Sequence, residues 1–177
     1  MKRGSPFEIE NKKIITIHSG EYYVTKDPDV VIYTLLGPCI AVCLYDQVTG
    51  IGGMNHFMLP ESVEFQLANW GHFGLQSLEI MMNHLQSEGA VLQNMKAKVF
   101  GGSNMADFHN RENDVALANI QFTLKYLESK RIPIMARELG GLYGRKIYYF
   151  LNDYSVYVQR LIKEGIHQDV SEQSQYR

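Results

Sequence analysis

The fold is decided by residues 30–46, which read VVIYTLLGPCIAVCLYD. Two runs in this stretch, Val30–Leu36 and Ile40–Tyr45, are rich in β-branched and aromatic residues and predict two strands. Gly37-Pro38 between them predicts a turn, because proline fixes φ and pushes the preceding residue towards extended backbone. The rest of the first half continues this pattern of short strands broken by turn residues.

Seven further segments have strand composition: Ile14–Ile17, Tyr22–Thr25, Ile51–Leu59, Met95–Phe100, Ile134–Leu139, Lys146–Leu151 and Val156–Leu161. Apolar residues at offsets 3, 7 and 10 predict a helix within Gly74–Glu88, and a second helix should start at Asn113 or Asp114 and end near Lys130. Because the strands come first and the helices late, we expect one or two mixed sheets with helices packed outside, not alternating βαβ units.

The chain has 177 residues, which favours one domain with a sizeable core. Its 17 basic and 19 acidic side chains give a net charge of −2, so no basic footprint for nucleic acid is visible. No apolar run approaches the ~18 residues of a membrane helix, and the N-terminus lacks the apolar stretch of a signal peptide. We therefore expect a cytoplasmic protein without membrane insertion, with one domain over 14–165 between flexible polar segments 1–13 and 166–177.

The two cysteines, Cys39 and Cys43, exclude a disulfide framework. On one strand they would face the same side, but their Cα atoms would lie about 13 Å apart, beyond disulfide reach. Cys43, in an apolar run, is expected in the core. Cys39 emerges from the Gly-Pro turn and has two interpretations. It is either another core cysteine or a nucleophile whose own backbone N–H stabilises an oxyanion.

A cysteine nucleophile needs a base, because the thiolate is the attacking form. His56 is the candidate, since Asn55-His56 interrupts an otherwise apolar strand after two glycines; a hydrogen-bonded core histidine is the alternative. A zinc site through Cys39, His56 and His72 would need the fold to bring them together, because neither C-x-x-C nor H-E-x-x-H occurs.

Two glycine-rich turns carry polar residues. Gly101-Gly102-Ser103-Asn104 is either a plain turn or a backbone nest for an anion, and without a P-loop lysine it does not predict nucleotide binding. Residues 139–146 form a turn with two cations, Arg145 and Lys146, which are either solvated or in contact with an acidic partner.

Four blocks, residues 34–46, 53–60, 97–105 and 139–146, resemble the CheD family in sequence and in order. The resemblance implies a chemoreceptor glutamine deamidase of bacterial or archaeal chemotaxis. It also implies an α/β (α+β) fold, a sandwich of two β-sheets flanked by helices, of the cysteine-hydrolase type similar to deamidating bacterial toxins. The implied partners are the cytoplasmic domain of a methyl-accepting receptor and, as in several members, the phosphatase CheC.

The resemblance further implies a Cys-His-Thr catalytic group without metal or organic cofactor. Cys39 would attack the glutamine amide, His56 would act as base, and Thr34 would orient the imidazole. Tyr33 is the alternative third member, because a one-residue slip in a strand turns the side chain to the other face. Candidate substrate contacts are Asn55, Gly101, Gly102, Ser103 and Asn104.

Some positions depart from the family pattern. Pro38 replaces a small residue, residues 69–71 read Asn-Trp-Gly instead of Arg-Tyr-Gly, and Ala116 and Ala118 replace glycine and arginine. The changes at Asn69, Ala116 and Ala118 favour a rival interpretation, a non-catalytic adaptor that binds receptors or CheC, whereas the intact Cys39 and His56 favour the enzyme. A zinc-dependent hydrolase is a second rival. Hydrolysis of a glutamate methyl ester also stays open, because it would pass through the same thioester.

Overall fold

The computed structural model describes residues 9, 11–58, 76–104, 115–161 and 173–177. Helical residues 76–87 are followed by the short 3-10 helix η1 (Leu92–Asn94), and the later helix is α2 (Val115–Ser129). The strands are β1 (Lys13–Thr16), β2 (Tyr22–Thr25), β3 (Val30–Leu36), β4 (Ile40–Asp46), β5 (Ile51–Phe57), β6 (Met95–Gly101), β7 (Ile134–Leu139), β8 (Gly144–Phe150), β9 (Val156–Leu161) and β10 (Gln173–Tyr176).

The strands form two five-stranded sheets. The first sheet has the order β1-β3-β8-β9-β10, and the second sheet has the order β2-β5-β4-β6-β7. Each sheet contains one parallel pair, β1 with β3 and β6 with β7, while its other pairs are antiparallel. The mixed sheets expected from the order of strands and helices are therefore confirmed.

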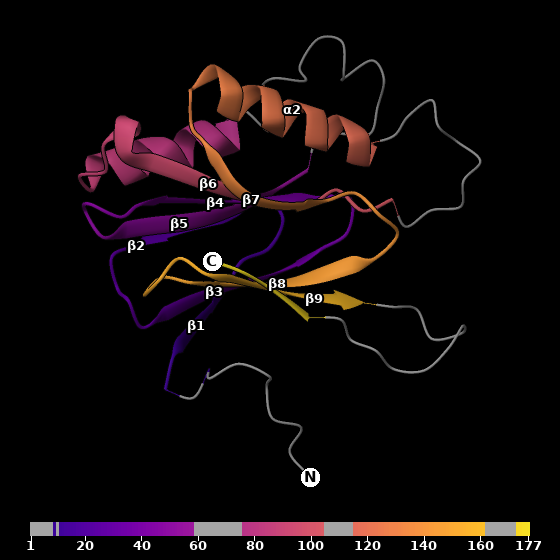
Figure 1. Cartoon of the computed structure of the whole chain (residues 1–177), viewed down its shortest axis with the longest axis horizontal. Coiled ribbons are helices and arrows are strands. Elements are labelled where there is room, and N and C mark those ends of the chain that lie inside the picture. Colours follow the sequence, from indigo (N-terminus) through magenta and orange to yellow (C-terminus); the bar gives the residue numbers. More distant parts are fainter. Residues whose placement is uncertain (1–8, 10, 59–75, 105–114, 162–172) are drawn as a thin grey trace.

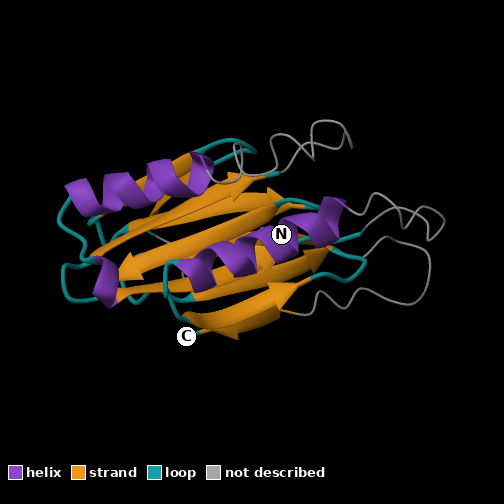
Figure 2. Cartoon of the chain, turned by 90° about the horizontal axis from the view of Figure 1, so that it is seen from above, coloured by secondary structure: helices purple, strands orange, loops and turns teal. Residues whose placement is uncertain are grey.

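The sheets lie face to face, and both described helices cover the outer face of the second sheet (Figure 1). Viewed from above, the helices lie over that sheet with their axes roughly along its strands (Figure 2). The predicted sandwich of two sheets with helices outside is thus confirmed. Within the described residues, no helix covers the outer face of the first sheet.

Strand alternation divides the apolar residues between two cores. On β4, Ile40, Val42 and Leu44 face the helices, whereas Ala41, Cys43 and Tyr45 face the first sheet. We call these the helix-side core and the inter-sheet core. A strand buried on both faces reads as a continuous apolar run, which explains why this stretch is so easily recognised in the sequence.

The C-terminal segment differs from the flexible tail expected from its composition. Residues 173–176 form β10, which pairs antiparallel with β9, and the Tyr176 ring lies 5.4 Å from the Phe100 ring. An edge strand is held largely through its backbone, so polar composition did not reveal it. The predicted starts of both helices and the end of the predicted strand at Leu59 lie outside the described residues. None of the helices in the described part is long and apolar enough to span a membrane.

Candidate active site

Cys39 lies where the chain crosses from the first sheet to the second. β3 ends at Leu36 and β4 begins at Ile40, and the three connecting carbonyls each accept a hydrogen bond. The Ser103 amide donates to Gly37 at 2.9 Å, and the Gly102 amide donates to Cys39 at 2.8 Å. The Asn119 side chain, on α2, donates to the Pro38 carbonyl at 3.0 Å. The backbone that carries the thiol is therefore fixed from two directions.

The close approach at Gly101 requires glycine. Its φ is +112°, and an added Cβ would lie 2.2 Å from the Cys39 carbonyl oxygen. Neither the backbone conformation nor the contact distance tolerates a side chain. The turn after β6 thus reaches the Cys39 connection only because residue 101 has no Cβ.

His56 lies on β5 with its side chain in the layer between the sheets. Its register partner on β4 is Ala41, two residues beyond Cys39, and both Ala41 and Cys39 belong to the inter-sheet core. His56 is thus a diagonal neighbour of both Cys39 and Cys43 on this face, at a backbone spacing of about 7–8 Å. The turn before β2 holds His56 as well, because Gly20 donates to its carbonyl at 2.7 Å and Glu21 accepts from its amide at 2.9 Å.

A hydrogen bond between the two sheets fixes the His56 ring. The Thr34 hydroxyl, on β3, lies 2.7 Å from His56 Nδ1 and donates to the Ile17 carbonyl at 2.8 Å. Because the hydroxyl has one proton and the carbonyl can only accept, Nδ1 must carry the proton that it shares with Thr34. Nε2 then holds a free lone pair. It is buried without a hydrogen-bond partner among the described residues, as a base awaiting a proton would be.

Tyr33, the alternative third member, faces away from this group. Its ring lies 4.9 Å from the Tyr148 ring, its cross-strand partner on β8. Thr34, one residue on, is fully buried between the sheets. The structure therefore brings Thr34, and not Tyr33, to His56.

Burial keeps both reactive groups neutral. Desolvation raises the pKa of the Cys39 thiol, although a hydrogen bond from Ser19 and the Cys39 backbone amide favour the thiolate. Desolvation also lowers the pKa of His56 to about 4; repulsion from His18 acts in the same direction, and Glu21 opposes it. At neutral pH the resting site therefore holds a thiol and an uncharged imidazole.

Cys43 has the environment expected of a core residue. It is completely buried in the inter-sheet core, and desolvation raises the pKa of its thiol far above the ordinary range. Neither cysteine is in a disulfide. The two cysteines share a face, as predicted. Cys39, just before β4, accepts a hydrogen bond from Ser19, which lies in the turn that also binds the His56 backbone, whereas Cys43 is fully enclosed in the core.

The residues expected to contact substrate already form hydrogen bonds within the protein. Asn55 points towards the helices, where its oxygen accepts from the Val42 amide and its nitrogen donates to the Ser77 hydroxyl at 2.9 Å. The amides of Gly102, Ser103 and Asn104 donate to Cys39, Gly37 and Gly141. All three amides therefore donate to carbonyls of the protein and do not form an anion-binding nest.

Three contacts around the Cys39 connection were not predicted from the sequence, those of Ser19 with Cys39, Asn119 with Pro38 and Arg145 with Ser103. No local pattern predicts them, because the partners are 20, 81 and 42 residues apart in the chain. Arg145, expected to be solvated or to contact an acidic partner, is instead buried and paired with Glu138 of the same chain. Within the described ranges, no three His, Cys, Asp or Glu side chains are grouped to hold a metal ion.

Comparison with known proteins gives the family. The family described as "CheD chemotactic sensory transduction" matches residues 58–160. A Bordetella parapertussis protein named "Probable chemoreceptor glutamine deamidase CheD" is 40% identical over 152 residues, which cover 85% of this chain and 71% of the relative. The chain belongs to the CheD family.

Other CheD proteins show the same level of similarity. A "Probable chemoreceptor glutamine deamidase CheD" of Methylobacillus flagellatus is 38% identical over 88% of this chain and 76% of its own length. A Geobacter sulfurreducens relative of the same printed name, numbered CheD 1, is 38% identical over 86% of this chain and 80% of its own. The family resemblance predicted from the four sequence blocks is thus confirmed.

Solved structures give only distant similarity. The Bacillus licheniformis hypothetical protein YfiH has a TM-score of 0.42 and 14% sequence identity, over 72% of this chain and 59% of that one. At this level the likeness carries no argument about activity.

Proposed function

We propose that this protein hydrolyses glutamine side chains of chemotaxis receptors to glutamate, with Cys39 as nucleophile, His56 as base and Thr34 as the residue that orients the base. The observation that carries the proposal is the buried Thr34–His56 hydrogen bond, which leaves Nε2 unprotonated on the face of the second sheet that also carries Cys39. Membership of the CheD family, whose relatives carry the deamidase name, supports the choice of substrate.

In the first half-reaction, Nε2 of His56 takes the thiol proton of Cys39, and the sulfur attacks the amide carbon of the substrate glutamine. The carbonyl oxygen becomes an oxyanion, for which the Cys39 amide is the candidate donor. Protonated His56 then gives its proton to the departing nitrogen. Ammonia leaves, and a glutamyl thioester remains on Cys39.

In the second half-reaction, neutral His56 takes a proton from water, and the resulting hydroxide attacks the thioester carbon. When the tetrahedral intermediate collapses, the C–S bond breaks and the sulfur regains its proton from His56. The product is a glutamate on the receptor, which adds one negative charge to its surface. The reaction needs no metal or organic cofactor.

The electrostatics support a general-base mechanism rather than a preformed thiolate–imidazolium pair. Because the pKa of His56 is about 4, the imidazole is uncharged and able to accept a proton throughout the neutral range. We expect kcat/KM to fall only when the pH drops towards 4, as His56 becomes protonated in the free enzyme.

The test is mass spectrometry of a receptor cytoplasmic fragment from the source organism after incubation with the protein. Wild type should convert particular glutamines to glutamate, a gain of one mass unit, and Cys39→Ala should convert none. Cys43→Ala is the matched control, because it removes the same side chain from the same face of β4, at a position that is completely buried in the inter-sheet core. It should retain the activity in proportion to its folded fraction.

Two results would contradict the proposal. If wild type and Cys39→Ala both bind the fragment and neither converts a glutamine, the protein is an adaptor and not an enzyme. If conversion by Cys39→Ala equals that by wild type, the nucleophile is not Cys39.

A further inference from the structure

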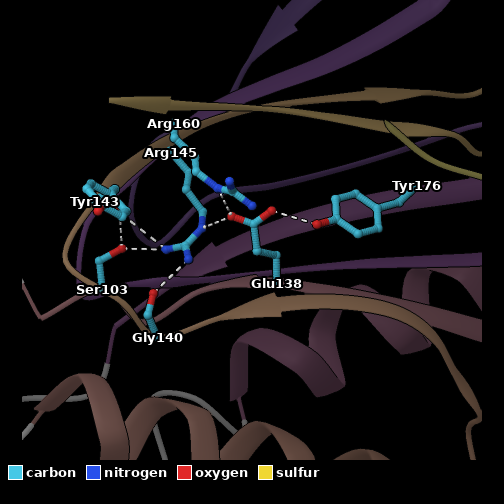
Figure 3. Close-up of polar contacts among 7 residues, drawn as sticks. All are labelled: Ser103, Glu138, Gly140, Tyr143, Arg145, Arg160 and Tyr176. Atoms are coloured by element: carbon cyan, nitrogen blue, oxygen red, sulfur yellow. Dashed lines mark hydrogen bonds and ion pairs between the residues drawn. The ribbon is translucent and has the colours of Figure 1, made fainter. Parts of the chain in front are cut away.

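A partly buried charge cluster joins the two sheets at one side of the sandwich (Figure 3). Glu138, on β7 of the second sheet, accepts hydrogen bonds at 2.9 Å from Arg145 on β8 and from Arg160 on β9, both in the first sheet. Its other carboxylate oxygen accepts from the Tyr176 hydroxyl at 2.6 Å. The cluster thus includes β10, which lies beyond the residues matched by the family.

The charges in this cluster depend on one another. Arg145 and Arg160 are direct register partners, an unfavourable arrangement for like charges unless an anion lies between them. Burial alone would raise the pKa of Glu138, but the hydrogen bonds from Arg160, Tyr176 and Arg145 outweigh it and lower the pKa to about 2. Glu138 is therefore ionised and holds both guanidinium groups in place.

Arg145 reaches beyond this ion pair. Its guanidinium donates to the Ser103 hydroxyl at 2.6 Å, to the Gly140 carbonyl at 2.7 Å and to the Tyr143 carbonyl at 3.2 Å. The Ser103 hydroxyl also donates to Tyr143. Arg145 is buried, with only 3% of its surface exposed. Three of these hydrogen bonds go to the two glycine-rich turns, and one goes to Glu138.

Those two turns hold the backbone of the candidate nucleophile. The Gly140 amide donates to Gly101 and the Asn104 amide donates to Gly141, so the turns are bonded to each other. The same turn of residues 101–104 supplies the Gly102 and Ser103 amides that fix the carbonyls of Cys39 and Gly37. A continuous set of hydrogen bonds therefore runs from Tyr176 through Glu138 and Arg145 to the connection that carries Cys39.

We propose that Arg145 is a positioning residue for Cys39, and that Tyr176 on the C-terminal strand assists it by holding Glu138. This rests on the proposed function, since it assigns how the nucleophile is kept beside His56. Arg160 distinguishes positioning from simple ion pairing. It binds the same Glu138 oxygen, with 27% of its side chain exposed, but no hydrogen bond joins it to the described turn residues 101–104 and 140–143 that Arg145 contacts.

The test compares Arg145→Lys with the matched control Arg160→Lys, both in a Cys43→Ala background so that Cys39 is the only thiol. Lysine keeps the charge but cannot reproduce the planar fork that binds several acceptors at once. The rate of alkylation of Cys39 by iodoacetamide is measured across pH by mass spectrometry, together with kcat and KM for the receptor fragment.

We expect Arg145→Lys to move the midpoint of the alkylation profile to higher pH by about one unit, because a displaced thiolate loses its stabilising donors. We also expect kcat to fall about 10-fold while KM changes less than about 2-fold. Arg160→Lys should leave the midpoint in place at a similar loss of stability. Tyr176→Phe keeps the ring against Phe100, removes one hydroxyl, and should shift the midpoint in the same direction by less.

The proposal is overturned if Arg145→Lys and Arg160→Lys change the midpoint equally, or if neither Arg145→Lys nor Tyr176→Phe changes it. If Arg145→Lys fails to fold, Tyr176→Phe decides alone. The alkylation profile needs no receptor. A wild type that deamidates nothing therefore refutes the proposed function while leaving the positioning of Cys39 to be judged by its own measurement.

Discussion

The Thr34 hydroxyl orients the imidazole ring of His56. Its hydroxyl proton goes to the Ile17 carbonyl, so its oxygen is left to accept from Nδ1 and selects the tautomer in which Nε2 carries no proton. A hydroxyl carries no charge and so stabilises an imidazolium less than a carboxylate would. This agrees with a site in which burial lowers the pKa of His56 to about 4.

Thr34→Val should lower kcat by about 10- to 100-fold, because it keeps the shape of the side chain and leaves both Nδ1 and the Ile17 carbonyl without a partner. Thr34→Ser should recover most of the rate. Tyr33→Phe, on the neighbouring residue that faces the other way, serves as control and should retain wild-type turnover of the receptor fragment. If Tyr33→Phe lost turnover and Thr34→Val retained it, Tyr33 and not Thr34 would be the residue that orients His56.

The connection between β3 and β4 shows how whole elements build the site. Two strands, one turn and one helix contribute to it: the strands that it joins, the turn that follows β6, and α2 through Asn119. Each carbonyl from residue 37 to residue 39 has its own donor, so the connection has little freedom to move. This packing requires glycine at position 101, where the end of β6 touches the Cys39 carbonyl.

Gly101→Ala should destabilise the fold by about 3 kcal/mol or more, since the new Cβ would overlap the Cys39 carbonyl and strain the backbone. Gly140→Ala is the matched control. Its φ of +76° also lies in the left-handed region, but nothing lies within 4 Å of an added Cβ, so only the strain of about 1 kcal/mol applies. Urea denaturation of the two variants measures the difference. Equal losses would show that the contact at Gly101 costs nothing.

The two sheets are joined by polar contacts at their margins as well as by the inter-sheet core. Thr34 and His56 join them at the candidate active site, and Glu138 joins β7 to β8, β9 and β10. Lys98, buried on β6, donates to the carbonyls of Tyr154 and Tyr176 at 2.6 and 3.1 Å and so also ties the sheets together. Such buried polar contacts specify how the sheets are aligned, which apolar packing alone does not.

Glu138 should make the sandwich sensitive to acid. The pKa of Glu138 is about 2 in the folded protein and near 4.5 in the unfolded chain. Between pH 4.5 and 2, therefore, the unfolded chain binds a proton at this residue and the folded protein does not. The stability that this carboxylate contributes, about 3 kcal/mol, is present above pH 4.5 and is lost as the pH falls towards 2.

Glu138→Gln should therefore have a lower free energy of unfolding than wild type at pH 7. Between pH 4.5 and 2 its free energy of unfolding should fall less than that of wild type, because residue 138 no longer binds a proton. Glu79→Gln is the control, because its ion pair with Lys130, 2.7 Å long, lies on a partly exposed surface and contributes little. Chemical denaturation across pH compares the two. Similar acid profiles for wild type and Glu138→Gln would contradict the assignment.

The sequence by itself determined most of the strands and the membership of the family, and it proposed Cys39 and His56 as candidate catalytic residues. Strands buried on both faces, such as Ile40–Asp46, form continuous apolar runs between turn residues, and this information is local. The Gly37-Pro38 turn and the polar Asn55-His56 pair also stand out from their immediate neighbours.

Only the tertiary structure decided which face each residue takes and which distant groups meet. It turned Thr34 towards His56 and Tyr33 away, directed Asn55 to the helices, paired a polar C-terminal segment with β9, and buried Arg145 against Glu138. These outcomes depend on strand register and on contacts across the sandwich. A one-residue change of register reverses every side chain, and no local pattern encodes a partner that lies many residues away.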